Sequence, residues 1–363
     1  MNQQLQQVFK PEQLLNELQT LRPRCWDNTI NTESVQAINN NGELNIAMPN
    51  KERTGDEAYK LNHWAHTQFA DKLDIPWKYY HKLLKHNRTD LLVENINGWI
   101  DTVDNRTFRM VGDTIRAVVS ERYRAFDHLD LYKLAILEIQ KNNAKIYECS
   151  LTETRMYVKA LLPHTELEIV ENDAVIPGII LSNSEVGAGK TKVEPFLLRK
   201  VCSNGMIGQH SFGRIHVGGK RDLGVIDFSD KVESLQNDLD KQIVKETIES
   251  AFDPNIYEGW VESIKKGVDF IIPRRADAVE AMSKKFLFSK DEENDILNFF
   301  AEEKESNKWT LANSITRLAR DKNTNYDRKV ELERIGADIA VMPNASLETI
   351  LKTKQIQEEL EKE

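Results

Sequence analysis

Cysteine is scarce in this chain of 363 residues, and long apolar runs are missing from its sequence. The three cysteines, Cys25, Cys149 and Cys202, are far apart and form no CxxC pair, which fits a reducing compartment and argues against a structural zinc site. No stretch reaches the roughly 18 apolar residues of a membrane span. The first residues, MNQQLQQVFKPEQ, lack the basic and apolar parts of a secretory signal. We therefore expect a cytoplasmic protein with buried cysteines and no membrane association.

Composition otherwise fits an ordinary soluble protein, with 40% apolar and 29% charged residues. The net charge of −9 is unevenly distributed: residues 1–105 carry −3, residues 106–225 carry +3 and residues 226–363 carry −9. Within the positive part, residues 190–221 hold seven Lys and Arg residues against one acid, Glu194. Such a local excess attracts phosphate groups even in an acidic protein, although a solvated loop face beside acidic neighbours is the simpler alternative.

The apolar pattern predicts an α+β fold with an antiparallel or mixed β-sheet core. Leucines at helical spacing follow Pro11, and Asn40-Asn41-Gly42 joins two short β-prone runs in a predicted hairpin. A second hairpin is predicted around Gly112-Asp113, and short strands follow from residue 145 with no crossover helix between them. We divide the chain into an N-terminal helix and hairpin (1–59), a helical insert (60–105), a β-rich core with a basic face (106–228) and a helical C-terminal region (229–363).

The stretch LSNSEVGAGKTKVEPF contains Gly189-Lys190-Thr191, which ends like the phosphate-binding loop of an NTPase. That loop needs an earlier glycine where this chain has Ser184, and a helix beginning at the lysine. Pro195 and the β-prone residues after it predict a strand instead. We therefore interpret the glycines as a turn between strands. This interpretation argues against an NTPase. Lys190 and Lys192 beside this turn could still contact a phosphate of a polynucleotide.

Arginine and aromatic residues alternate in the second hairpin and just after it, a combination that suits the phosphates and bases of single strands. The alternative is structural: Tyr123 and Phe126 belong to the core, and the arginines pair with Glu121, Asp127 and Asp130. The residues concerned are Arg106, Arg109, Arg116, Arg122, Tyr123, Arg124 and Phe126.

Other chemistry has weaker support in the sequence. His63 and His66 are three residues apart on a predicted helix, but no third metal ligand accompanies them. Cys202 has basic neighbours, yet a buried inert thiol is the better interpretation. A metal-dependent nuclease stays open as an alternative because three acids, Asp173, Glu185 and Glu194, flank the basic region without a recognisable spacing.

The order of several motifs resembles a phage- and plasmid-related family catalogued as domain of unknown function nine-three-two. The motifs are HTQFADKLDIPWKYYHKLL, RAVVSERYRAFDH, VIPGIILSNSEVGAGKTKVEPFLLRKVCSNGM with HVGG, and WTLANSITRLAR, within about residues 60–325. The family has no settled activity. Its occurrence in mobile elements and its α+β core make it similar, more remotely, to single-strand annealing proteins of recombination, an argument by fold-level analogy.

We therefore expect a non-catalytic protein of a phage or plasmid, acting on single-stranded DNA in recombination, annealing or replication in the cytoplasm of a bacterial host. The alternatives are a metal-dependent nuclease and a host-interaction or structural protein. No cofactor or metal is expected, a homo-oligomer is possible, and the sequence identifies no host partner. The predicted nucleic-acid contacts are Arg109, Arg116, Arg122, Tyr123, Arg124, Lys190, Lys192, Arg199 and Lys200.

Overall fold

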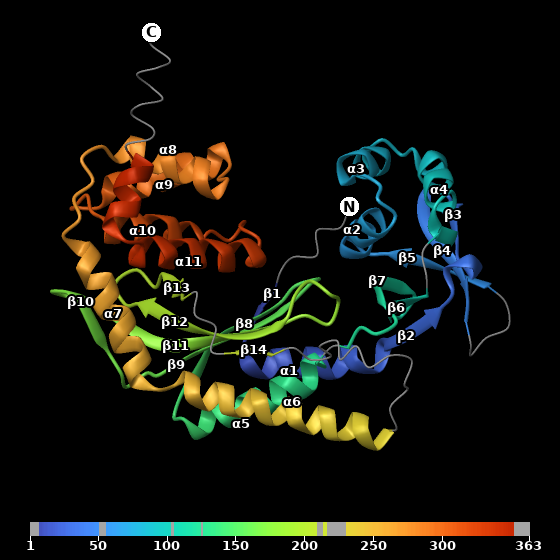
Figure 1. Ribbon diagram of the computed structural model, residues 1–363, viewed down its shortest axis with the longest axis horizontal. Coiled ribbons are helices and arrows are strands. Elements are labelled where there is room, and N and C mark those ends of the chain that lie inside the picture. Colours follow the sequence, from blue (N-terminus) through green and yellow to red (C-terminus); the bar gives the residue numbers. More distant parts are fainter. Residues whose placement is uncertain are drawn as a thin grey trace, which may run out of the picture.

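Two β-sheets, each covered by helices, make up the computed structural model, which describes residues 7–50, 56–102, 105–124, 126–208, 213–215 and 230–351 (Figure 1). The fold is α+β, as the sequence predicts. Sheet A has the order β1-β8-β9-β11-β12-β13, with β10 beside β11 and β14 beside β12. Its strands are β1 (Gln7–Phe9), β8 (Lys145–Leu151), β9 (Met156–Leu161), β10 (Leu167–Val170), β11 (Asp173–Asn183), β12 (Thr191–Arg199), β13 (Gly205–Ile207) and β14 (Gly213–Ile215).

Sheet B has the order β2-β6-β7-β5-β4-β3 and is mixed, because β5 and β7 run parallel while its other pairs are antiparallel. Its strands are β2 (Cys25–Ile30), β3 (Gln36–Asn40), β4 (Glu43–Pro49), β5 (Asp56–Leu61), β6 (Arg106–Val111) and β7 (Thr114–Ser120). The predicted Asn-Gly hairpin is confirmed: β3 and β4 are joined by Asn41 and Gly42, both with positive φ. The second hairpin, β6–β7, lies in this sheet and not with β8–β12.

Three helices cover one face of sheet B, with buried side chains such as Phe69, Tyr80, Leu92 and Phe108 between them and the strands. These helices lie in the predicted helical insert. They are α2 (His63–Lys72), α3 (Trp77–Lys85) and α4 (Thr89–Asn97), followed by the short 3₁₀ turn η3 (Ile100–Thr102). Two further 3₁₀ turns flank β2, η1 (Arg22–Arg24) and η2 (Thr32–Ser34).

Sheet A is covered on both faces (Figure 1). One face packs on α1 (Pro11–Leu21), α5 (His128–Lys141) and α6 (Asp230–Ala251). Pro11 occupies the first turn of α1, where its missing N–H has no helical partner to lose. The opposite face packs on α11 (Tyr326–Val341), which belongs to a group with α7 (Pro254–Val268), α8 (Arg275–Phe286), α9 (Lys290–Glu302) and α10 (Lys308–Leu318). The chain is helical again from residue 344 to 351, and the end of the predicted helical C-terminal region, 352–363, lies outside the described residues.

A buried ion pair fixes α11 on sheet A. The ammonium of Lys159 in β9 lies 2.8 Å from Glu333 and 3.3 Å from Glu148, and its side chain is only 3% exposed. Tyr326 donates a hydrogen bond of 2.5 Å to Glu148, and its ring lies beside the Lys159 ammonium. Because a buried charge without a partner is costly, these contacts fix the position of α11 over the sheet.

Gly178 lies where β11 passes closest to β9. A Cβ atom there would lie 2.0 Å from the carbonyl oxygen of Ala160, with backbone atoms on that side that cannot move away freely. We predict that Gly178→Ala lowers the free energy of unfolding by about 3 kcal/mol, because it forces apart two central strands. Urea unfolding followed by circular dichroism measures the change.

The matched control is Gly259→Ala in the exposed part of α7, where nothing lies within 4 Å of the added atom. This variant should be stabilised by about 0.5–1 kcal/mol, since alanine loses less backbone entropy in a helix. Equal stability of the two variants would contradict the close approach of β9 and β11.

Candidate functional site

The loop between β11 and β12, residues 184–190, is the point where the two sheets meet. Gly187 and Gly189 have φ values of +77° and +150°, which L side chains rarely adopt. The strand β12 begins directly afterwards at Thr191, and Pro195 lies within it opposite Ile179. The predicted glycine turn followed by a strand is therefore confirmed.

Side chains from both sheets hold the backbone of this loop. From α2, Trp64 Nε1 and Gln68 Nε2 donate to the carbonyl oxygen of Val186 at 2.8 and 2.9 Å. Tyr123 donates through its hydroxyl to the Ser184 carbonyl and accepts from the Gly187 N–H at 3.0 Å. From the connection between β8 and β9, Arg155 donates to the carbonyl of Ala188.

Glu185 is the buried centre of this junction. Its Oε2 lies 2.7 Å from Nη1 of Arg116 in β7, and its Oε1 accepts the His128 backbone N–H at the start of α5 at 2.6 Å. The two charged side chains are only 8% and 10% exposed. Burial alone would raise the pKa of Glu185, but its interactions with His128 and Arg116 outweigh this effect and lower the pKa to about 2. Glu185 is therefore ionised at neutral pH.

Arg109 in β6 makes the second contact from sheet B. It donates through Nη1 to the Glu185 carbonyl oxygen and through Nε to Asp27 at 3.1 Å. The partners of Arg109 and Arg116 are thus Asp27 and Glu185, and not the neighbouring acids Glu121, Asp127 and Asp130 of the structural alternative.

A neutral histidine completes the buried network. Asn183 donates through Nδ2 to the Phe126 carbonyl at 2.8 Å and lies 2.8 Å from His128 Nδ1, while Thr191 donates to Asn183 Oδ1 at 2.6 Å. Since Nδ1 accepts here, its proton is absent, and burial lowers the pKa of His128 in agreement with this arrangement. Phe126 packs in the core, as the structural alternative expected.

The nine predicted nucleic-acid contacts fall into three groups. Arg109, Arg116 and Tyr123 hold the junction. Four others surround it: Arg122, Arg124 and Lys190 are exposed, and Lys192 is half-buried at the start of β12. The last two, Arg199 and Lys200, lie at the far end of β12, roughly 30 Å away at about 3.3 Å per residue.

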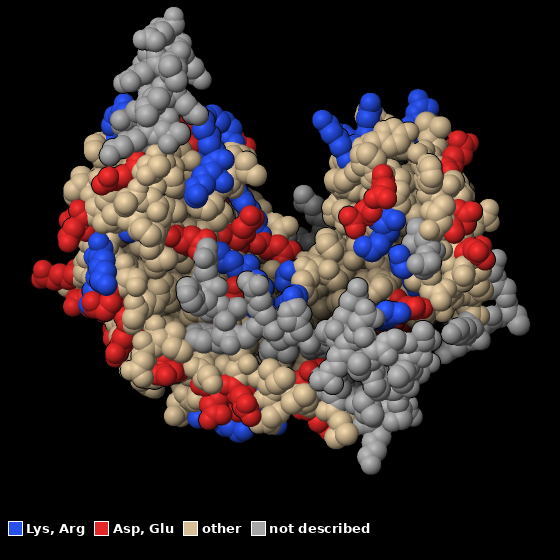
Figure 2. Space-filling model, viewed as in Figure 1, with Lys and Arg blue, Asp and Glu red and all other residues tan. Residues whose placement is uncertain are grey.

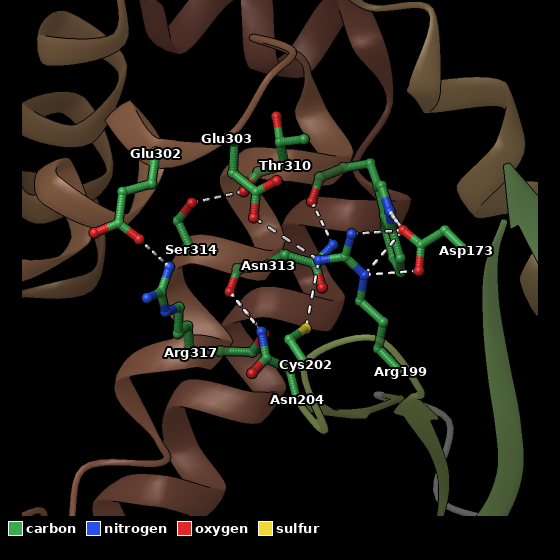
Figure 3. Close-up of polar contacts among 12 residues, drawn as sticks. Asp173, Arg199, Cys202, Asn204, Glu302, Glu303, Thr310, Asn313, Ser314 and Arg317 are labelled. Atoms are coloured by element: carbon green, nitrogen blue, oxygen red, sulfur yellow. Dashed lines mark hydrogen bonds and ion pairs between the residues drawn. The ribbon is translucent and has the colours of Figure 1, made fainter. Parts of the chain in front are cut away.

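Arg199 belongs to a separate polar cluster beneath α10 (Figure 3). Asp173 accepts from its Nε at 2.8 Å and also from Trp309 Nε1 at 2.9 Å. Glu303 and the Cys202 sulfur lie near the opposite side of the same guanidinium. Lys200, half exposed, pairs with Glu166 at 2.7 Å. These contacts secure the end of β12 against the C-terminal helices.

The three acids considered for a nuclease each pair with a different arginine. Asp173 pairs with Arg199, Glu185 pairs with Arg116, and Glu194 accepts two hydrogen bonds from Arg334. Over the described part of the chain, no three His, Cys, Asp or Glu side chains form a group that could hold a metal ion. His66 hydrogen-bonds Tyr80 at 3.0 Å, and burial lowers its pKa to about 4.

The cysteines are free thiols, of which Cys149 is buried while Cys25 and Cys202 are half-buried. Within the described ranges, no helix is both long and apolar enough to span a membrane.

These features define an α+β protein whose two sheets are joined by a loop that carries a buried charge, Glu185. Comparison with known families adds one match: residues 116–222 match the model of the domain of unknown function DUF932. The match is shorter than the resemblance seen in the motifs, and it contains Arg116, His128 and Glu185 of the junction. Searches of curated proteins and of solved structures gave no match.

Removing the Glu185 charge tests the junction. Glu185→Gln keeps the side-chain volume but leaves the Arg116 guanidinium buried without its anion, which should cost about 3–5 kcal/mol of unfolding free energy. Urea unfolding at pH 7 measures this loss. The control is Glu171→Gln, an exposed turn residue, with an expected change below about 0.5 kcal/mol.

The same pair gives a pH dependence with a defined sign. Because the pKa of Glu185 is lowered to about 2, its contribution is complete above the unfolded pKa of about 4.3 and is lost as the pH falls toward 2. The wild type should therefore lose more stability than Glu185→Gln between these values. If the free energy of unfolding of the two proteins changed equally with pH over this range, the result would contradict the buried ion pair.

Proposed function

We propose that the protein binds single-stranded nucleic acid through the exposed cations around the 184–190 loop, without catalysis. One observation carries the proposal: the junction brings cations from two distant segments of the chain to one place. Arg122 and Arg124 flank Tyr123, whose hydroxyl is hydrogen-bonded to the loop, while Lys190 is the last residue of the loop and Lys192 follows it. Several cations near one another are what a phosphate backbone requires.

The surroundings of the loop suit an extended ligand. A hollow lies between the lobe formed by α8–α11 and the lobe formed by α2–α4, and Lys and Arg side chains line parts of it while Asp and Glu side chains line others (Figure 2). Sheet A extends from beneath the first lobe toward β6 and β7 of the second (Figure 1), and the tip of its β11–β12 hairpin contacts α2 and sheet B there. We propose that a strand lying in the hollow contacts the four cations around this tip.

Only some of the basic residues predicted from the sequence are assigned to phosphate contact. Arg109 and Arg116 are engaged with Asp27 and Glu185, and Arg116 is almost fully buried. Tyr123 is half-buried, with its hydroxyl bound on both sides and the Arg109 guanidinium 6.0 Å from its ring centroid. We therefore assign these three residues to holding the loop, and Arg122, Arg124, Lys190 and Lys192 to phosphate contact.

The carboxylate that lies beside Lys192 does not cancel this charge. Glu194 in β12 receives the Arg334 guanidinium at 2.6 Å, and Lys192 lies 4.0 Å from it. The three side chains together carry a net positive charge, so Lys192 contributes to an attractive potential along β12.

The biological setting follows from the motifs and stays a proposal as well. We propose that the protein serves a phage or plasmid in recombination, annealing or replication, in the cytoplasm of its bacterial host. The nuclease alternative would be favoured by shortening of an oligonucleotide only when magnesium or manganese is added.

Fluorescence anisotropy with a single-stranded oligonucleotide across a salt series tests the proposal. Lys190→Glu with Lys192→Glu should weaken binding and make the slope of log K against log salt shallower by about 1.4, since each single-strand phosphate contact contributes about 0.7.

The control, Lys200→Glu with Lys265→Glu, changes the net charge equally at exposed lysines just after β12 and in α7, each paired with a carboxylate. It should bind nearly as the wild type does. A wild-type protein that binds no oligonucleotide at low salt, or binds with no salt dependence, would overturn the proposal.

A further inference from the structure

Helix α3 carries a cationic face that is separate from the loop. Between Asp74 and Asp90 the sequence has four Lys and Arg residues and no acid. Lys78, Lys82 and Lys85 lie at positions i, i+4 and i+7 of α3, on one side of the helix over about 10 Å of its length. Arg88 follows just beyond the helix, and all four side chains are exposed.

No carboxylate in the described part of the chain neutralises these four cations. Among the residues that the structure describes, none of the four takes part in an ion pair. Several exposed lysines elsewhere are paired, for example Lys200 with Glu166, Lys265 with Glu262 and Lys284 with Glu280. The face of α3 therefore keeps its full positive potential for a ligand from outside.

The ligand must be a polyanion that stays on the surface. The apolar side of α3 is already occupied, since Tyr80 is 0% and Leu83 is 6% exposed in the core beneath sheet B's helices. A helix that inserts into a lipid surface needs that side free. The one large hydrophobic side chain that α3 exposes is Tyr79, at 44%, and an aromatic ring beside lysines suits a nucleotide base as well as its phosphate.

Packing connects α3 to the loop. His63 and His66 of α2 contact Trp77 and Tyr80 of α3, and α2 in turn holds the loop through Trp64. With helix packing distances of about 8–10 Å, α3 lies roughly 20 Å from the loop. In the space-filling view, Lys and Arg side chains project from the top of this lobe, at the edge of the hollow (Figure 2).

We propose that α3 is a second contact surface for the phosphodiester backbone of single-stranded nucleic acid. Lys78, Lys82, Lys85 and Arg88 bind phosphates of the strand after it leaves the loop, and Tyr79 offers a face for a base. This inference rests on the proposed function, but it concerns residues that the loop site does not include.

The test compares pairs of charge reversals with an oligonucleotide of about 20 nucleotides, longer than the roughly 4–16 that one small binding surface covers. Lys82→Glu with Lys85→Glu should weaken binding roughly 10- to 30-fold at about 0.1 M salt and make the salt slope shallower by about 1.4. The milder pair Lys82→Gln with Lys85→Gln should give a smaller loss in the same direction, which guards against misfolding of the first variant.

The matched control is Lys265→Glu with Lys284→Glu, which changes the net charge equally at exposed, ion-paired lysines of α7 and α8. It should bind within about twofold of the wild type. Thermal unfolding of each variant confirms that the fold is kept.

Each other outcome overturns the inference. If both α3 variants bind as the wild type does while the Lys190 and Lys192 reversal binds more weakly, the α3 proposal is wrong and the loop proposal stands. A wild type that binds no oligonucleotide removes both proposals. If that wild type instead binds phosphatidylserine vesicles and the α3 reversal does not, the surface serves a membrane and not a nucleic acid.

Discussion

The buried contact between Arg116 and Glu185 determines how the two halves of this protein are joined. The guanidinium comes from the centre of sheet B, and the carboxylate comes from the hairpin tip of sheet A. Neither charge can remain in this position without the other, because the water that would otherwise solvate it is excluded. The loop, the start of α5 and the neighbouring Arg109 are all positioned by contacts with the same glutamate residue.

Sheet A uses the same type of contact at several other places. Lys159 with Glu333 and Arg334 with Glu194 join the sheet to α11, and Arg199 with Asp173 closes the far end of β12. Each pair joins a strand to a residue distant in sequence or to a different element. The basic residues of this protein therefore divide into cations that hold the fold together and cations that face solvent, and only the second group is relevant to an external polyanion.

Local patterns in the sequence predicted much of the fold. Asn41 and Gly42 indicated their turn because few other residues accept positive φ there, and Pro195 indicated a strand where a phosphate-binding loop would need a helix. The hairpin around Gly112 was also predicted, but not the sheet that it joins. That choice depends on pairing with β2 and β5, which no local pattern encodes.

The site was predictable only in part for a similar reason. The partners of Arg116 and Arg109 are 69 and 82 residues away, so a count of neighbouring acids suggested the wrong carboxylates. No sequence pattern marked Trp64, Gln68 and Arg155 as part of the site, because each donates to a backbone carbonyl of the loop, which every residue type has. The charge of α3 was visible in the sequence, but averaging over residues 1–105 gave a negative total and concealed it.

The chain order of the sheets implies a sequence of events during synthesis. All strands of sheet B lie between residues 25 and 120, whereas β1 and α1, made earlier, pack on β8 and α5, made later. Sheet B can therefore complete its hydrogen bonds on the ribosome before β8 and α5, on which α1 packs, have been synthesised. Arg116 would stay hydrated during that time, until the hairpin that carries Glu185 emerges and sheet A packs against sheet B.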